Sequence, residues 1–205
     1  MRNDMKLPVK STALALFILC LGVSLVWAQN EQAPIIEREI AYQDWTYKNI
    51  RTGEKVNLRE FARDKKLVMV VYYAPWCGNW RFDSPIMKRF HEKYAAAGLG
   101  IIAIGNYDPL ESMKANLEEF KTPFPAVYEA AERNSRQSTL HYKYRTATGD
   151  NRKWGSPWYI FLDTSQMEKT GDTLIRKTHV VNGEVIEPEG DRFIRQKLGL
   201  AENKP

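Results

Sequence analysis

The feature that most constrains this chain is a run of seven apolar residues, Leu67–Tyr73, followed at once by Ala74-Pro75-Trp76-Cys77-Gly78-Asn79-Trp80. A run that is apolar on both faces predicts a central parallel strand. An amphipathic pattern begins after Cys77, so we expect its thiol at the N-terminus of a helix. Free backbone N–H groups and the helix dipole stabilise an anion there, including a thiolate. The sequence therefore predicts a thiol site at the end of a central strand.

Further apolar patterns predict the elements on either side. Short strands are expected at residues 45–47, 56, 101–104, 124–127 and 158–162. Helices are expected at 58–62 behind an Asn57 cap, at 109–120 behind Asp108, at 129–144, and after Asp191. The helix expected after Cys77 contains Pro85. Its predicted buried face carries apolar residues spaced four apart: Phe82, Ile86, Phe90 and Tyr94.

The Asn182-Gly183 pair predicts a β-hairpin between residues 173–181 and 184–186. The order β-α-β-α, then a hairpin and a helix, predicts an α/β fold whose mixed sheet is covered by helices on both faces. A length of 205 residues suits one medium domain, and the net charge of +5 is mild. Without a Lys/Arg run or a basic–aromatic stripe, we expect no nucleic-acid partner.

The N-terminus predicts export from the cytoplasm. A basic start and an apolar run end at Val26-Trp27-Ala28, which predicts a signal peptide over residues 1–28 of a secreted or periplasmic protein. An uncleaved membrane anchor facing outside the cytoplasm is the alternative. Residues 29–44 are expected as an extended lead-in, 45–200 as the domain and 201–205 as a tail.

Cysteine usage narrows the chemistry of the site. Cys20 and Cys77 are the two cysteines, and Cys20 would leave with the signal peptide. Cys77 is then buried, reactive, or paired in an intermolecular disulfide. The three histidines, His91, His141 and His179, are scattered, so we expect no metal site and no cofactor.

Several motifs together resemble the thioredoxin superfamily, within it the extracytoplasmic TlpA-like group. Trp76-Cys77 resembles the start of the Trp-Cys-x-x-Cys redox loop, and Ser156-Pro157 resembles the cis-proline that faces this loop. The match spans residues 45–200, and three further motifs agree: the segment Gly53-Glu54-Lys55-Val56-Asn57-Leu58, the helix proline Pro85, and Phe124-Pro125. The resemblance implies a thioredoxin-like fold with a central mixed sheet and a short N-terminal β-hairpin.

The resemblance also implies thiol–disulfide exchange with protein thiols or disulfides. Cys77 would be the catalytic residue, and Ser156 and Pro157 would line the substrate groove; the redox loop would comprise Trp76, Gly78, Asn79 and Trp80. Trp80, however, stands where the family has its second cysteine, so release of a mixed disulfide would need an outside thiol. Residues 132–153 lengthen the span between Cys77 and Pro157 and are expected to form an insertion over the site.

Alternatives to this monothiol oxidoreductase remain open from the sequence. The first is a binding module without redox turnover, in which the indole of Trp80 covers an inert thiol. Trp80 could instead offer an apolar platform, or simply fill the core. A second alternative is a peroxiredoxin-like peroxidase. The motif of that family has Pro and Thr or Ser at the positions that Val70 and Ala74 occupy, so this alternative is less favoured. Asp83, close after the cysteine, is expected to be a solvated helix residue.

Overall fold

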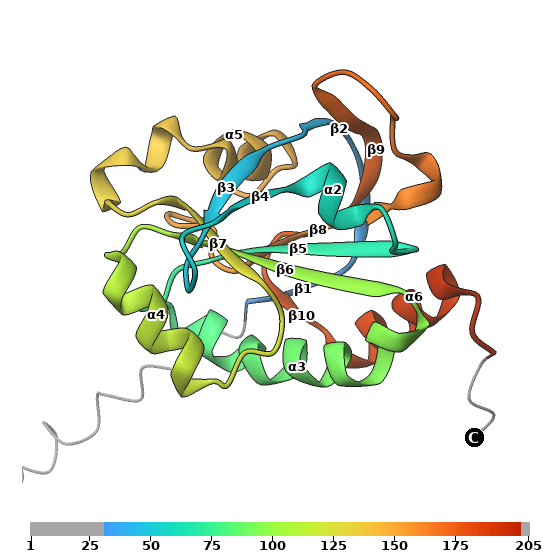
Figure 1. Ribbon diagram of the computed structural model, residues 1–205, viewed down its shortest axis with the longest axis horizontal. Helices are drawn as coiled ribbons and strands as arrows, with labels where there is room; N and C mark the ends of the chain where they lie inside the picture. Colours follow the sequence, from blue (N-terminus) through green and yellow to red (C-terminus); the bar gives the residue numbers. More distant parts are fainter. Residues whose placement is uncertain (1–30, 202–205) are drawn as a thin grey trace, which may run out of the picture. The chain divides into compact units, whose positions relative to one another are not determined.

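The computed structural model describes residues 31–201. Figure 1 shows a central sheet with helices above and below it. The sheet has eight strands in the order β2-β9-β8-β5-β6-β7-β3-β4, and β1 and β10 form a separate parallel pair. The predicted signal peptide 1–28, its Cys20 and residues 202–205 lie outside the described residues.

The strands are β1 (Gln32–Ala33), β2 (Ile36–Gln43), β3 (Thr46–Asn49), β4 (Lys55–Asn57), β5 (Leu67–Tyr73), β6 (Leu99–Asn106), β7 (Ala126–Ala130), β8 (Trp158–Asp163), β9 (Thr173–Val181) and β10 (Glu184–Val185). The α-helices are α2 (Leu58–Ala62), α3 (Gly78–Tyr94), α4 (Leu110–Glu119), α5 (Leu140–Ala147) and α6 (Glu187–Leu198). Short 3₁₀ helices cover η1 (Ala95–Ala97), η2 (Arg133–Ser138) and η3 (Thr164–Gln166).

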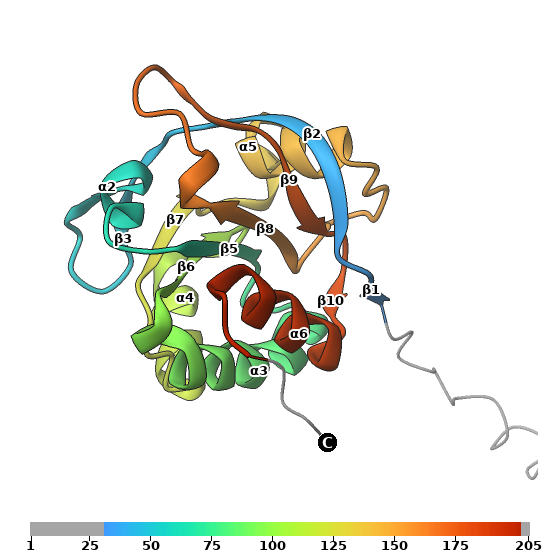
Figure 2. The same cartoon turned by 90° about the vertical axis from the view of Figure 1, so that its right-hand side faces the viewer.

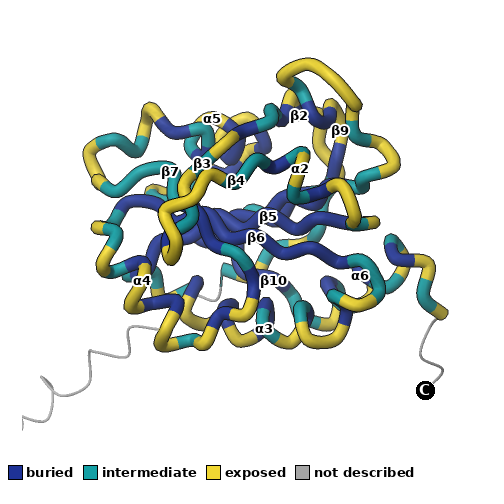
Figure 3. Tube along the Cα trace, in the orientation of Figure 1, coloured by how far each residue is buried: buried dark blue, intermediate teal, exposed yellow. Residues whose placement is uncertain are grey.

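The predicted central strand is confirmed. β5 pairs in parallel with β6 and antiparallel with β8, and every one of its residues is buried. Figure 3 shows this buried layer running through the middle of the molecule. The alternate side chains of β5 enter two apolar clusters, one under α3, α4 and α6 and the other under α2 and α5. Together with the antiparallel β3–β4 hairpin, this arrangement confirms the predicted α/β fold.

Residues 29–44 are not a lead-in outside the domain, because β2 is an eight-residue strand of the sheet. It pairs antiparallel with β9, and Figure 2 shows the two strands side by side. The side chains of Ile40 and Tyr42 are buried, while Glu39 and Ala41 between and beside them are exposed. This alternation is the period of a strand with one face in the core, and the charged residues around it obscured the signal.

The predicted hairpin at Asn182-Gly183 is wrong, because β10 pairs in parallel with β1 and no pairing of β9 with β10 occurs among the described strands. The side chain of Asn182 instead accepts a hydrogen bond from Trp158 Nε1 at 2.8 Å. A Cβ at Gly183 would lie 2.0 Å from the carbonyl oxygen of Glu31. Glycine is therefore needed for a close approach of the N-terminal segment rather than for a two-residue turn.

Three helix predictions also need correction. Residues 129–144 are not one helix: β7 ends at Ala130, and Glu129 accepts backbone hydrogen bonds at the start of α5, which a residue inside the same helix could not do. Pro109, not Asp108, is the N-cap of α4. α6 begins at Glu187, so Asp191 lies within the helix and accepts a hydrogen bond from Lys93.

The predicted buried stripe of α3 is confirmed at Ile86, Phe90 and Tyr94, but Phe82 is 56% exposed. The buried face also carries Trp80, Asp83 and Met87. Strict four-residue spacing drifts around a helix of 3.6 residues per turn, whereas alternating steps of three and four stay on one face.

The buried hydroxyl of Tyr42 tests whether β2 belongs to the core. It lies 2.7 Å from the hydroxyl of Tyr72 and accepts a hydrogen bond from Trp45 Nε1 at 3.0 Å. Tyr42→Phe leaves both partners buried without this atom, so we expect a loss of about 1–3 kcal/mol in the free energy of unfolding, measured with urea. Tyr128→Phe is the control, because the half-buried Tyr128 hydroxyl makes no hydrogen bond among the described residues. Equal effects of the two substitutions would contradict this account.

Candidate active site

The site lies where β5 ends and α3 begins. Cys77 is the N-cap residue of α3, with an extended backbone, and its side chain does not bond the first turn of the helix. The half-buried thiol donates to the carbonyl oxygen of Ser156 across 3.1 Å. Cys77 is the one cysteine among residues 31–201. The structure thus places the thiol at a helix N-terminus and against a segment that lies far away in the sequence.

Ser156 joins the two halves of the site. Its hydroxyl oxygen accepts a hydrogen bond from the backbone N–H of Ala74 at 2.9 Å, and its carbonyl accepts from the thiol. The Ser156–Pro157 peptide bond is cis. The structure therefore brings Cys77, Ser156 and Pro157 together, with Gly78 exposed beside them.

Trp80 belongs to the core, so the interpretation as an accessible platform is wrong. Its side chain is fully buried, and its ring centroid lies 4.7 Å from that of Tyr73. Its Nε1 donates to Asn116 Oδ1 at 2.9 Å, and the Asn116 amide also reaches the Pro75 carbonyl at 3.5 Å. The side chain in the position of a second cysteine therefore anchors α3 to α4 and holds the loop before Cys77.

Trp76 lies at the surface edge of the site. Its Nε1 donates to the carbonyl oxygen of Tyr107 at 3.1 Å, and its ring meets the edge of Trp154 with centroids 5.2 Å apart. Both indoles are half-buried. Trp76 precedes the thiol in sequence and Trp154 precedes the cis-proline segment, so the Trp pair lies beside Cys77.

Asn79 and Arg152 meet at one carboxylate. Asn79 Nδ2 donates to Glu31 Oε2 at 2.7 Å, and Arg152 Nη1 donates to the same oxygen at 2.9 Å. Arg152 also donates to the Pro157 carbonyl at 2.8 Å. The first turn of α3, the cis-proline segment and the described start of the chain are thus tied by charge-assisted hydrogen bonds.

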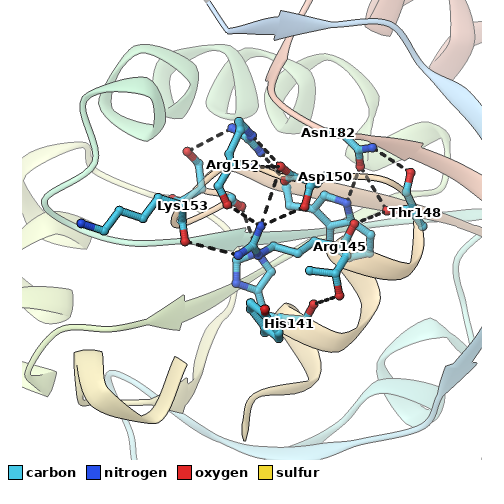
Figure 4. A network of polar contacts seen from close by, with 12 residues as sticks. His141, Arg145, Thr148, Asp150, Arg152, Lys153 and Asn182 are labelled. Carbon is cyan, nitrogen blue, oxygen red and sulfur yellow. Dashed lines mark hydrogen bonds and ion pairs between the residues drawn. The ribbon is translucent and has the colours of Figure 1, made fainter. Parts of the chain in front are cut away.

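The loop that precedes Ser156 is held by buried polar side chains of α5 (Figure 4). Arg145 is almost fully buried and donates to the carbonyl oxygens of Asp150, Arg152 and Lys153. A Cβ at Gly155 would lie 2.3 Å from the Arg145 side chain, so this packing requires glycine. The residues of the predicted insertion therefore support the cis-proline segment.

His141 extends this support as a neutral side chain. Its Nε2 lies 3.0 Å from the Gly155 carbonyl and its Nδ1 lies 2.9 Å from the Tyr107 hydroxyl. Since a carbonyl only accepts, Nε2 carries the proton and Nδ1 accepts from Tyr107. Burial lowers the pKa of His141 to about 3, which keeps the ring neutral. No group of three or more potential metal ligands gathers among residues 31–201.

Asp83 is the residue that the sequence interpretation missed. It is fully buried rather than solvated, and its Oδ2 accepts from Tyr159 Oη at 2.5 Å and from the Val185 N–H at 2.9 Å. Burial raises the pKa of Asp83 to about 7. Its spacing of three from Trp80 and four from Met87 places it on the buried face of α3, which is the signal that could have identified it.

A thioredoxin-like sheet, one cysteine at the first turn of α3, and the carbonyl of a cis Ser156–Pro157 peptide against its sulfur define this protein as a thioredoxin-fold protein with a single-cysteine site. The sequence profile of the AhpC/TSA family matches residues 38–153, and the chain belongs to this family.

Known proteins agree with the fold. A secreted thiol-disulfide isomerase from Corynebacterium glutamicum superposes with a TM-score of 0.58 at 17% identity, covering 80% of this chain and 92% of the other. A thiol:disulfide interchange protein from Chlorobium tepidum superposes with a TM-score of 0.55 at 17% identity, and the match covers 79% of this chain and 98% of that one. Protein disulfide-isomerase of Drosophila melanogaster is 32% identical over 87 residues, which are 42% of this chain and 16% of that protein. This chain thus spans only a small part of that relative.

Trp80 and Phe82 form a matched pair on one helix. Trp80→Ala removes a fully buried indole and leaves the side-chain oxygen of Asn116 without its donor, so we expect a loss of about 3–5 kcal/mol in the free energy of unfolding. Phe82→Ala removes an exposed ring, and we expect a change within about 0.5 kcal/mol. Urea unfolding of both variants checks this, and a small effect at Trp80 would contradict its place in the core.

Asp83 predicts a pH-dependent contribution to stability. Its pKa rises from 3.8 to about 7 on folding, so the unfolded chain releases the proton first and stability falls as pH rises from about 4 to about 7. Asp83→Asn removes this loss. The free energy of unfolding of the variant should therefore rise relative to that of the wild type across this pH range, by on the order of 4 kcal/mol at pH 8.

Urea unfolding between pH 4 and 8.5 measures this difference. The opposite contribution of His141, whose pKa falls on folding, is present in both proteins and cancels in the comparison. Asp64→Asn, at an exposed carboxylate, is the control and should show no such slope. A pH-independent difference between wild type and Asp83→Asn would refute the assignment.

Proposed function

We propose that this chain is a single-cysteine thiol–disulfide oxidoreductase that acts outside the cytoplasm, within the TlpA-like group of thioredoxin-fold proteins. The observation that carries the proposal is the position of the half-buried Cys77 as the N-cap of α3, with its sulfur 3.1 Å from the carbonyl oxygen of the cis Ser156–Pro157 peptide. Helix N-termini stabilise thiolates, and the thiolate is the nucleophile of disulfide exchange.

The exchange step follows from this geometry. The Cys77 thiolate attacks one sulfur of a partner's disulfide; a Cys77–partner disulfide forms, and the second partner sulfur leaves as a thiolate that takes a proton from water. When Cys77 loses its proton, the Ser156 carbonyl loses the hydrogen bond from the thiol. That carbonyl, which also lies 3.4 Å from Arg152 Nη1, then has a lone pair for the backbone N–H of an extended partner segment.

Release of the partner requires a thiol from outside the chain. Trp80 has no sulfur, and its buried indole fills the space one turn along α3. No second cysteine stands in residues 31–201. We therefore infer that the protein stops at the mixed disulfide until a second thiol arrives.

The proposed location outside the cytoplasm is supported by the predicted signal peptide and by the likeness in fold to a secreted bacterial isomerase. Among residues 31–201, no helix is long and apolar enough to cross a membrane.

The proposal predicts a long-lived mixed disulfide. We expect reduced protein carrying Cys20→Ser to form a 1:1 adduct with a peptide disulfide, and to keep it until dithiothreitol is added, because no internal thiol can attack the adduct. Intact-protein mass spectrometry over time measures this. The same chain with Cys77→Ser is the control and should form no adduct.

Two outcomes would support the alternatives instead. A Cys77 that reacts only after urea unfolding would indicate an inert thiol and favour a binding module. Turnover of hydrogen peroxide through a Cys77 sulfenic acid, without adduct formation from disulfides, would favour a peroxidase.

A further inference from the structure

The segment that supports the cis-proline also carries a concentration of positive charge. Residues 132–153 contain six basic residues against two acidic ones: Arg133, Arg136, Lys143, Arg145, Arg152 and Lys153 against Glu132 and Asp150. We define the Arg–Trp surface by three of these cations and the two indoles beside them, none of which is buried: Arg133, Arg136, Lys153, Trp76 and Trp154.

Two guanidinium groups of the Arg–Trp surface lie against its indoles. The Arg133 guanidinium carbon is 4.8 Å from the ring centroid of Trp76, and that of Arg136 is 5.0 Å from the centroid of Trp154. The two indoles meet edge to face at 5.2 Å. Stacking of this kind holds a cation in place while its N–H groups face outward at the ring edge. Arg136 Nη1 donates to the carbonyl oxygen of Lys153, so its remaining N–H groups and those of Arg133 can bind a partner.

These cations lack carboxylate partners. The buried Asp150 is occupied by Arg145 and Arg152, and Arg152 also pairs with Glu31. None of the ion pairs within residues 31–201 involves Arg133, Arg136 or Lys153. Figure 4 shows the Lys153 side chain extending away from the buried network. The positive charge on this surface is therefore not neutralised by the protein itself.

The surface adjoins the sulfur from both sides. Trp76 directly precedes Cys77, and Trp154 stands two residues before Ser156, whose carbonyl accepts from the thiol at 3.1 Å. A partner segment that brings a disulfide to Cys77 and continues past Trp76 and Trp154 must therefore lie on the Arg–Trp surface.

From this juxtaposition we propose that the protein selects partners whose disulfide is flanked by aspartate or glutamate residues, which pair with Arg133, Arg136 and Lys153. The inference rests on the proposed function and adds its substrate class. Arg binds carboxylates with two parallel hydrogen bonds, and the indoles provide a flat apolar surface for the partner's chain. Opposite charge also raises the rate of encounter, and salt weakens this effect.

The test measures the rate of a single exchange with matched peptides. Each peptide carries one cysteine as a mixed disulfide with 2-thiopyridine, flanked by Asp/Glu in one peptide and by Lys in the other. The Cys77 thiolate attacks the peptide sulfur, the Cys77–peptide disulfide forms, and pyridine-2-thiolate leaves and takes a proton to give the absorbing thiopyridone. The full chain with Cys20→Ser is used, and the uncharged disulfide of 2-hydroxyethanethiol with 2-thiopyridine reports the reactivity of Cys77 alone.

We expect the acidic peptide to react about tenfold faster than the basic one at low ionic strength, and this ratio to shrink at about 0.5 M salt. Arg133→Gln with Arg136→Gln should lower the ratio of the acidic-peptide rate to the uncharged-disulfide rate about fivefold. Lys55→Gln with Arg63→Gln removes the same charge from exposed residues of β4 and the end of α2, and should leave all three rates unchanged.

Each failure has its own signature. If none of the three disulfides reacts, the proposed function is wrong. If all three react at similar rates, exchange stands and the acidic partner is refuted. If the peptides react alike but the protein binds vesicles of anionic lipid through Arg133 and Arg136, the surface serves a membrane and not an acidic protein segment.

Discussion

The arrangement of the site depends on Ser156. Its hydroxyl oxygen accepts the N–H of Ala74 at 2.9 Å and its carbonyl accepts the Cys77 thiol at 3.1 Å, so one residue fixes both the loop before α3 and the sulfur itself. The two segments meet because β5 and β8 are antiparallel neighbours, which places the end of one beside the start of the other. Sheet topology thus creates the site, and Ser156 sets its geometry.

Ser156 is itself positioned by buried polar side chains of α5. Arg145 and His141 come from α5 and bind the carbonyls that lead to Ser156, and the neutral ring of His141 bonds Tyr107, whose own carbonyl accepts from Trp76. Buried polar groups need hydrogen-bond partners, and Arg145 has them at its Nη atoms but not at its buried Nε. The same segment places Arg133 and Arg136 against the indoles, so the support of the site and its surface charge have one origin.

Local patterns predicted the fold because each needed only its own stretch of sequence. The apolar run of β5, the Asn57 cap of α2 and the cysteine at the start of α3 are of this kind. Asp83 and Trp80 could be placed on a helix but not given partners, because Tyr159, Val185 and Asn116 belong to distant elements. Asn182-Gly183 misled for the same reason: contacts with Trp158 and Glu31 override its turn preference.

Trp80 does more than fill space in the core. The indole occupies a fully buried position, lies against Tyr73 of the central strand with the two rings tilted by 37°, and shares Asn116 with the loop before Cys77. A smaller side chain at this position would leave a cavity and would leave Asn116 Oδ1 without its donor, so the packing of α3 against α4 depends on Trp80. Trp80 thus helps to hold the loop that leads to Cys77, the one cysteine among residues 31–201. In the proposed function, release of the partner then depends on a thiol from outside these residues.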